Sequence, residues 1–313
     1  MLARTADSLY WCARYIERAD FLARIIDASL RMGSLPSSYG GDESEWESAL
    51  ASASARVAFY QTHDHADERT VCDFLVFGRN NPSSIWSCLN AARANARAVR
   101  TALTLEMWEA INEAWNELQR YDCDNMDRES MARFLEWVKR ISLLFDGASY
   151  RTMLRNDSYW FLRLGMAIER ADNTARILDV KYHLLLPERE PVGGTLDYFQ
   201  WTTILRVVSA LTAFHWVYRT SVKPWLVADL LILNRQMPRS LFSCHAEIME
   251  RLDQLADFYG RRGPSQRMAS NTLSKLESSR IEDLFQNGMH EFITGFLRDN
   301  ATLGSAIAEQ YLV

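Results

Sequence analysis

The sequence predicts an all-α protein whose two homologous helical bundles pack as one globular unit. Apolar residues recur with the 3.6-residue period of an α-helix along most of the 313 residues, and no run shows the two-residue alternation of a half-buried strand. Apolar side chains make up 48 % of the chain, enough for a sizeable core. The pentapeptide IERAD occurs twice, at 16–20 and at 168–172.

Clusters of Gly and Pro interrupt the helical period and mark the expected ends of the helices. These breaks are GSLPSSYGG, NNPSS, PEREPVGG, QMPRS and GRRGPSQ. Between them, segments rich in Ala, Leu, Arg and Glu favour the helical state. In chain order, the expected helices cover 5–32, 43–62, 68–78, 83–119, 128–147, 156–186, 196–220, 222–234, 239–260, 272–287 and 289–312.

The repeated phrase is part of a longer internal match. Nine of the twelve residues in 16–27 are identical to those in 168–179. FLVFGRNNPSSIWSC in the first half corresponds to LLILNRQMPRSLFSC in the second. The separation between matched residues grows steadily along the chain, as short loop insertions would produce. The pattern predicts an internal duplication with halves 1–148 and 149–313.

Charge and cysteine usage narrow the class of protein. The net charge of -5 argues against a general nucleic-acid binder. Charged residues near the N-terminus leave no room for the apolar region of a signal peptide, and the longest uncharged apolar run, 207–218, is too short to span a bilayer. We therefore expect a cytoplasmic protein without nucleic-acid or membrane partners. No CxxC occurs, so we expect buried free thiols at Cys12, Cys72, Cys88, Cys123 and Cys244.

The repeated phrase places charged residues along one stripe of each helix. The first stripe contains Glu17, Asp20, Arg24 and Asp27, and the second contains Glu169, Asp172, Arg176 and Asp179. Asp and Arg four residues apart can form an ion pair. Three interpretations remain: a solvated face, an ion-pair network buried between the halves, or a cleft that holds a zwitterionic ligand or a metal. Such a cleft would be lined by Glu17, Arg18, Glu169 and Arg170.

A metal centre is the weakest of these interpretations. Di-metal helical bundles use Glu-x-x-His motifs, and neither stripe contains His. The segment QTHDHADE, with His63 and His65, could bind zinc, but residues two apart on a helix point to different sides. We interpret it as a polar loop or helix end and predict no metal and no cofactor.

Four basic segments are candidate contacts for an anion or a partner. RNNPSSIWSC and NRQMPRSLFSC each predict a helix start, with Pro82 and Pro238 in the first turn and Asn81 as a cap. These starts are either plain caps or phosphate cradles. The cradles would use Arg79, Ser83, Ser84, Arg235, Arg239 and Ser240.

The other two segments differ in kind. AARANARAVR would present Arg93, Arg97 and Arg100 as one helical stripe, which is either a solvated face or a contact. FYGRRGPSQR, at 258–267, predicts a flexible basic loop that could dock a partner. No Walker A, GxGxxG, GxSxG or HExxH motif occurs, so nothing in the sequence indicates autonomous catalysis.

Three stretches carry a family resemblance: LYWCARYIERADFLARIID, NPSSIWSCLNAARANARAVR and LEMWEAINEAWNEL. They resemble the alpha-E domain family, a bacterial all-helical family of unknown function, and the resemblance covers essentially the whole chain. The family usually has Glu where this chain has Asp20. The resemblance implies a circularly permuted ATP-grasp protein as a partner, often with a transglutaminase-like protein, in amide or peptide ligation. The family's catalytic residues are not established, so the resemblance identifies only the motif positions in this chain, which are Glu17, Arg18, Glu169 and Arg170.

These observations leave three hypotheses. The first is a non-catalytic helical protein that positions substrate for an ATP-grasp ligase. The second is an enzyme or ligand-binding protein with a site between the halves, in which Glu17 and Glu169 are the catalytic candidates. Its ligand-binding candidates are Arg18, Arg170, Asp20, Asp172, Arg24 and Arg176. The third is a homodimeric scaffold without a ligand.

Overall fold

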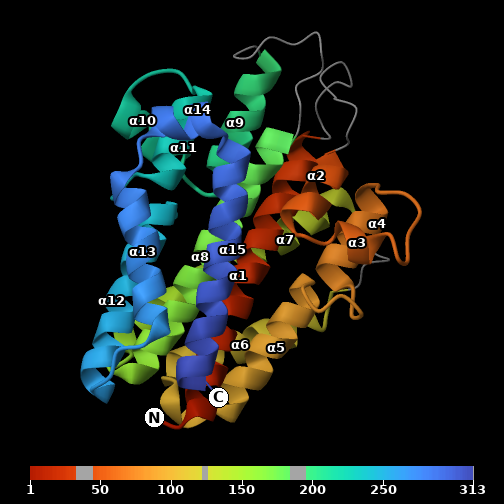
Figure 1. Ribbon diagram of the computed structural model, residues 1–313. Helices are drawn as coiled ribbons and strands as arrows, with labels where there is room; N and C mark the ends of the chain where they lie inside the picture. Colours follow the sequence, from red (N-terminus) through yellow and green to blue (C-terminus); the bar gives the residue numbers. More distant parts are fainter. Residues whose placement is uncertain (33–44, 122–125, 184–194, 313) are drawn as a thin grey trace.

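The structure is a computed structural model, and it describes residues 1–32, 45–121, 126–183 and 195–312. Every regular element in these ranges is helical, which confirms the predicted all-α class (Figure 1). The α-helices are α1 (Ala3–Met32), α2 (Glu45–Ser52), α3 (Arg56–Phe59), α4 (Glu68–Cys72), α5 (Ile85–Ala98), α6 (Leu105–Leu118), α7 (Arg128–Thr152), α8 (Asp157–His183), α9 (Thr195–Val207), α10 (Leu211–Tyr218), α11 (Pro224–Ile232), α12 (Leu241–Tyr259), α13 (Pro264–Ser278), α14 (Ile281–Asn287) and α15 (Met289–Ile307). Two π-helical segments, η2 (Asp73–Phe77) and η5 (Ala308–Leu312), and a 3-10 turn, η3 (Arg100–Ala102), complete the described elements.

Two long helices, α1 and α8, pack against each other in the middle of the molecule and carry the two IERAD phrases (Figure 1). Helices α5 and α7 pack on α1, while α12 and α15 pack on α8. Helix α6 contacts both α5 and α7, and α13 contacts both α12 and α15. The two phrases are therefore surrounded by helices, and most of their side chains are buried.

Helices α1 and α8 approach closely at one glycine. A Cβ atom added at Gly165 would lie 2.2 Å from the carbonyl oxygen of Tyr10, closer than any real contact. Only glycine leaves room for the backbones to meet at this distance. The close approach brings the charged stripes of the two helices into reach of one another.

One hydrophobic core extends through the described residues from Ala6 to Leu312. It contains fully buried side chains from both predicted halves, such as Leu9 and Ile26 on α1 and Leu162 and Leu178 on α8. The division at residue 148 thus stays a prediction. No described helix combines the length and the apolar character that crossing a bilayer requires.

Several predicted helices are divided in the structure. The expected helix 83–119 ends at Ala98 and resumes as α6 at Leu105, where the Thr104 hydroxyl accepts from the backbone N–H of Met107. The expected helix 43–62 is divided at Ser54, and 196–220 is divided at Ser209. Both serines have positive φ, 51° and 55° respectively. Serine is not a strong helix breaker, so composition does not indicate these turns.

Other boundaries were wrong because Pro was interpreted as a break. Pro264 begins α13, and the side chain of Gln266 accepts from the backbone N–H of Gly263 ahead of it. Helix α13 therefore starts inside the predicted 258–267 loop, because Pro fits the first turn of a helix. Helix α7 also continues to Thr152, beyond the expected end. The breaks GSLPSSYGG and PEREPVGG lie outside the described residues.

Candidate functional site

The carboxylates of the repeated phrase are buried at the α1–α8 interface. Glu17, Asp20 and Glu169 expose 1 %, 0 % and 2 % of their surfaces, while Asp172 is partly buried. A fully solvated face is therefore wrong for this stripe. A carboxylate in such surroundings must have charged partners, because an unpaired buried ion costs several kcal/mol.

The two Glu–Arg pairs exchange partners across the interface. Arg18 donates to Glu169 from Nε to Oε1 at 2.6 Å and from Nη2 to Oε2 at 3.1 Å. Arg170 donates to Glu17 from Nε to Oε1 at 3.1 Å and from Nη2 to Oε2 at 2.8 Å. Both contacts are bidentate, the strong geometry for an arginine and a carboxylate. Each phrase therefore supplies the cation for the other.

Each glutamate also accepts a hydrogen bond from a second arginine. The two second arginines do not occupy corresponding positions in the internal sequence match. Arg14, one turn before Arg18 on α1, donates to Oε2 of Glu169 at 2.8 Å. Arg239, just before α12, donates to Oε1 of Glu17 at 2.8 Å. In the internal sequence match, Met166 stands at the position of Arg14 and Ser83 at that of Arg239. Both glutamates nevertheless receive three hydrogen bonds from two arginines.

The Asp–Arg pairs connect each phrase to a helix break of the other half. Arg24 donates to Asp20 at 2.7 Å and to the hydroxyl of Ser209 at 2.7 Å. Arg176 donates to Asp172 at 2.5 Å and to the hydroxyl of Ser54. The predicted i,i+4 pairs thus form, and each reaches a serine with positive φ. Asp20 also accepts from Arg239 at 3.0 Å.

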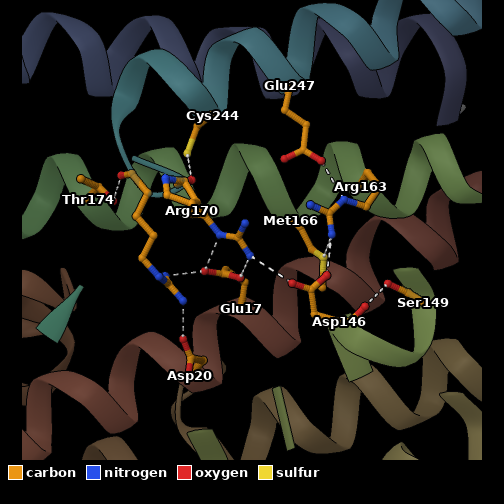
Figure 2. Close-up of polar contacts among 12 residues, drawn as sticks. Glu17, Asp20, Asp146, Ser149, Arg163, Met166, Arg170, Thr174, Cys244 and Glu247 are labelled. Carbon is orange, nitrogen blue, oxygen red and sulfur yellow. Dashed lines mark hydrogen bonds and ion pairs between the residues drawn. The ribbon is translucent and has the colours of Figure 1, made fainter. Parts of the chain in front are cut away.

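The network extends to α7 and α12 through a residue that sequence reasoning missed. Arg163 on α8 donates to Asp146 on α7 at 2.5 Å and to Glu247 on α12 at 2.7 Å. Figure 2 shows these contacts beside the Arg170–Glu17 pair, with Asp146 lying between Arg163 and Arg170. Nothing in the sequence pattern signals Arg163, because its partners are remote in the chain. Arg14 could have been found, since it lies four residues before Arg18 on the same stripe.

The charges in this network nearly cancel. It holds six carboxylates, Glu17, Asp20, Asp146, Glu169, Asp172 and Glu247. It holds seven guanidiniums, Arg14, Arg18, Arg24, Arg163, Arg170, Arg176 and Arg239. The buried acids are thus compensated by side chains of this chain.

The electrostatics keep the two glutamates ionised. Burial alone would raise the pKa of Glu17, but Arg170 and Arg239 more than offset it and lower the pKa to about 2. Burial opposes ionisation of Glu169 too, and Arg18 and Arg14 lower its pKa. A general acid or base works best with a pKa near the operating pH. Neither glutamate meets that condition in this arrangement.

Three of the described cysteines, Cys12, Cys88 and Cys244, are equally unsuited to nucleophilic chemistry. Cys12, Cys72, Cys88 and Cys244 are buried free thiols, as predicted, and Cys123 lies outside the described residues. Burial raises the pKa of Cys12, Cys88 and Cys244 to about 12, which suppresses the nucleophilic thiolate. Among the described residues, no group of His, Cys, Asp and Glu gathers closely enough to hold a metal ion.

The two predicted helix starts are capped by serines. The Ser84 hydroxyl accepts from the backbone N–H of Ser87 at 3.1 Å, and Ser240 accepts from that of Ser243 at 3.0 Å. The helices therefore begin at Ile85 and Leu241, three residues after Pro82 and Pro238, which corrects the predicted first turns. Both capping serines are fully buried.

The arginines of these segments already have partners. Arg79 lies over the ring of Trp86, with 4.9 Å from Cζ to the centroid. Arg235 pairs with Glu277 at 3.3 Å, while Arg239 belongs to the buried network. The Ser83 hydroxyl accepts from Arg18 at 3.4 Å. The groups proposed for a phosphate cradle are thus engaged in contacts within the protein.

The predicted basic stripe is divided between two elements. Arg93 and Arg97 lie on α5, but the helix ends at Ala98, so Arg100 belongs to the turn η3. Arg93 donates to Asn112 and lies 5.7 Å from the ring centroid of Trp115. Arg100 lies over the ring of Trp108 at 5.1 Å. Arg97 alone projects freely from α5, so these residues do not form one continuous contact surface.

A cavity in the described part of the chain lies away from the repeated phrase. It has a volume of about 850 Å³ and lies between α6 and α7. A smaller apolar hollow of about 80 Å³ lies among α1, α2, α8 and α9. Neither hollow is lined by Glu17, Arg18, Glu169 or Arg170. The geometry brings these four residues together as two ion pairs across the α1–α8 interface, outside both hollows.

Comparison with known proteins supplies a family context. The model of a family described as a predicted alpha-helical domain with a conserved ER motif matches residues 1–312. Uncharacterised proteins of Mycobacterium bovis and Mycobacterium tuberculosis are each 24 % identical over 304 residues. The match covers 90 % of this chain and 33 % of each relative, so this chain spans about a third of their length. No solved structure matches the chain.

Proposed function

This chain belongs to the Alpha-E family, whose model covers residues 1–312, and on that premise we propose that it is a non-catalytic helical partner of an amide or peptide ligase of the ATP-grasp class. In this proposal the ligase performs the phosphoryl chemistry and this protein positions the substrate. The observation that carries the non-catalytic role is the closed ion-pair network, in which Glu17 and Glu169 are each bound by two arginines.

The alternative, an enzyme with its site between the two halves, requires these carboxylates to be available. A substrate would have to displace Arg170 and Arg239 from Glu17, or Arg14 and Arg18 from Glu169. Displacing a partner leaves a buried ion uncompensated, which costs about 3–5 kcal/mol. The network thus favours a structural role for the ER pairs: they fasten α1 to α8.

The reciprocal contacts also support the proposed duplication, with halves 1–148 and 149–313. Arg18 to Glu169 and Arg170 to Glu17 are the same contact made in opposite directions. Arg24 to Ser209 and Arg176 to Ser54 form a second such pair. Two copies of one bundle, packed about an approximate twofold axis, would produce both. We propose that the two exchanging pairs are the ER motif named in the family description.

The ligase partner follows from the family resemblance, and the length of the relatives supports a partner of some kind. Those proteins carry about two thirds of their length beyond the matching region. In those relatives the matching region is joined to a further polypeptide, which supports a polypeptide partner for this region. Trp216 on α10 and Trp225 on α11 expose 80 % and 47 % of their surfaces and are suited to that contact. The transglutaminase-like partner, the cytoplasmic location and a homodimer stay predictions.

The direct test uses the purified ATP-grasp protein and this chain. We expect the two to copurify with Mg-ATP, and we expect ATP-dependent amide formation by the ligase to rise when this chain is added. Combined Trp216→Ala and Trp225→Ala should weaken copurification, whereas Tyr150→Ala, which removes an exposed aromatic residue on α7, should not. The proposal fails if binding and activity of the ligase are unchanged with and without this chain.

A further inference from the structure

We propose that the cavity between α6 and α7 binds the zwitterionic end groups of an amino acid or short peptide, with Arg140 holding the carboxylate and Glu113 holding the ammonium. The inference rests on the proposed function only in taking this ligand to be a substrate of the ligase. Binding itself is a property of this chain alone and can be tested without any partner.

The cavity has the size of a small-molecule site. Its volume of about 850 Å³ falls within the range of roughly 300–1,000 Å³ typical of ligand pockets. Helix α6 forms one wall and α7 the other, so two rigid elements position the lining side chains. The lining residues are Glu113, Ala114, Asn116, Glu117, Arg120, Tyr121, Arg133, Glu136, Trp137, Arg140 and Ile141.

Most charges around this cavity are already neutralised by neighbours on their own helices. Just beyond the end of α6, Arg120 pairs with Glu117 on that helix at 2.9 Å. On α7, Arg133 pairs with Glu129 at 2.5 Å, and Glu136 pairs with Lys139 at 2.6 Å. These lining charges therefore already have a partner of opposite charge within the protein.

Two lining charges differ from the rest. Glu113 on α6 and Arg140 on α7 make no ion pair or hydrogen bond with any residue that the structure describes, and they do not pair with each other. One carboxylate and one guanidinium thus line the same cavity from its two walls, both exposed to solvent and available to a ligand. A ligand that carries an ammonium and a carboxylate complements both at once.

Aromatic side chains supply an apolar surface beside these charges. Tyr121 and Trp137 line the cavity, with ring centroids 5.6 Å apart. Phe134 packs against both rings from the core, at 4.8 Å and 5.4 Å, and holds them in place. The side chain of a bound peptide would pack on this surface, which adds affinity without dependence on its charge.

The test measures the contribution of each end group of the ligand to binding, by combining ligand variants with protein variants. The full chain is titrated with alanyl-phenylalanine, with its N-acetyl form and with its C-terminal amide, and binding is measured by ligand-observed NMR. We expect the free dipeptide to bind best, with a loss of roughly two- to fivefold for each blocked terminus, as for exposed ion pairs.

The protein variants assign each loss to one residue. In Glu113→Gln, N-acetylation should no longer weaken binding, while amidation still should. Arg140→Gln should show the reverse. Glu106→Gln and Arg97→Gln, exposed charges on α6 and α5 outside the cavity lining, should leave both losses unchanged. The inference is overturned if wild-type protein binds none of the three ligands, or if the losses persist equally in both cavity variants. Either failure would leave the ligase interaction itself untouched.

Discussion

Arg18 binds Glu169 across the α1–α8 interface at 2.6 Å, while Glu17, the residue beside Arg18, is bound by Arg170 from the opposite helix. Two adjacent residues on α1 thus face two adjacent residues on α8, and the charges alternate. The contact fixes the register of the two helices, because a shift by one residue along either helix would place like charges together. The following predictions test this arrangement.

Replacing one buried glutamate should destabilise the protein strongly. In Glu169→Gln, the guanidiniums of Arg14 and Arg18 lose their buried partner, and we expect a loss of about 3–5 kcal/mol in the free energy of unfolding. Glu17→Gln should behave alike. Denaturant unfolding followed by circular dichroism measures the change, with the exposed Glu106→Gln as the control. Stable, fully folded variants that lose a function instead would favour a catalytic site at these residues.

Protonation of Glu17 in acid should weaken its ion pairs with Arg170 and Arg239 and destabilise the protein. Its pKa is about 2 in the folded protein and near 4.5 in the unfolded chain. A lowered folded pKa contributes stability above the unfolded pKa, and that stability is lost as the pH falls from about 4.5 towards 2. The loss in the free energy of unfolding over this pH range should be roughly 3 kcal/mol. Unfolding free energies measured from pH 6 downward should fall over this window, and the fall should be shallower in Glu17→Gln; parallel curves would contradict the assignment.

The close approach at Gly165 should not tolerate a methyl group. Gly165→Ala places a Cβ atom 2.2 Å from the carbonyl oxygen of Tyr10, so α1 and α8 must separate, at a cost of about 1–3 kcal/mol. Gly147→Ala on α7 is the matched control, since nothing lies within 4 Å of its added Cβ. That change should stabilise the helix by about 0.5–1 kcal/mol. Equal melting temperatures for the two variants would show that the helices are not in contact here.

His245 should make the protein sensitive to mild acid. It is fully buried on α12, and no hydrogen bond of normal geometry reaches its ring nitrogens from the described residues, although Asn300 lies close by. Burial lowers its pKa to about 4, only partly opposed by Asn300. Because the folded pKa is lowered, the unfolded chain takes up the proton first, and stability is lost as the pH falls from about 6.5 towards 4.

The internal sequence match supplies the variant that tests this. Leu89 stands at the position corresponding to His245. A leucine at position 245 should therefore fit the core around α12. His245→Leu should also remove the loss of stability between pH 6.5 and 4. Unfolding measured at pH 7 and at pH 5 should show a larger gain at pH 5. A gain independent of pH would mean that His245 is already solvated or paired in the folded protein.

Helical periodicity predicted part of the site correctly. It placed Glu17, Asp20 and Arg24 on one stripe, and the structure forms the Asp20–Arg24 pair at 2.7 Å. The local spacing is enough for such a contact, because both residues lie on one helix. The same reasoning did not find Arg239, whose partners Glu17 and Asp20 are remote in the sequence. Contacts of this kind depend on tertiary packing, which spacing along one helix does not reveal.

Some of the helix breaks could be predicted from local sequence, and others could not. Among the described residues, the breaks NNPSS and QMPRS lie between helices as predicted, whereas Pro264 starts a helix that had been interpreted as a loop. The breaks at Ser54 and Ser209 were not anticipated, since serine is compatible with a helix. Ser209 accepts a hydrogen bond from Arg24 on α1, and Ser54 accepts one from Arg176 on α8. The turn is thus supported by a tertiary contact, which explains why local composition gives no sign of it.

The crossed arrangement of Glu17 with Arg170 and Glu169 with Arg18 constrains how the gene can change. A substitution in one copy of the phrase leaves an uncompensated ion whose partner is encoded about 150 codons away. Acceptable variants therefore require simultaneous or rapidly compensated changes at both sites, and the two copies cannot diverge independently. Neither segment can be exchanged alone with that of a distant homologue, so recombination within the gene should succeed only when both copies are inherited together.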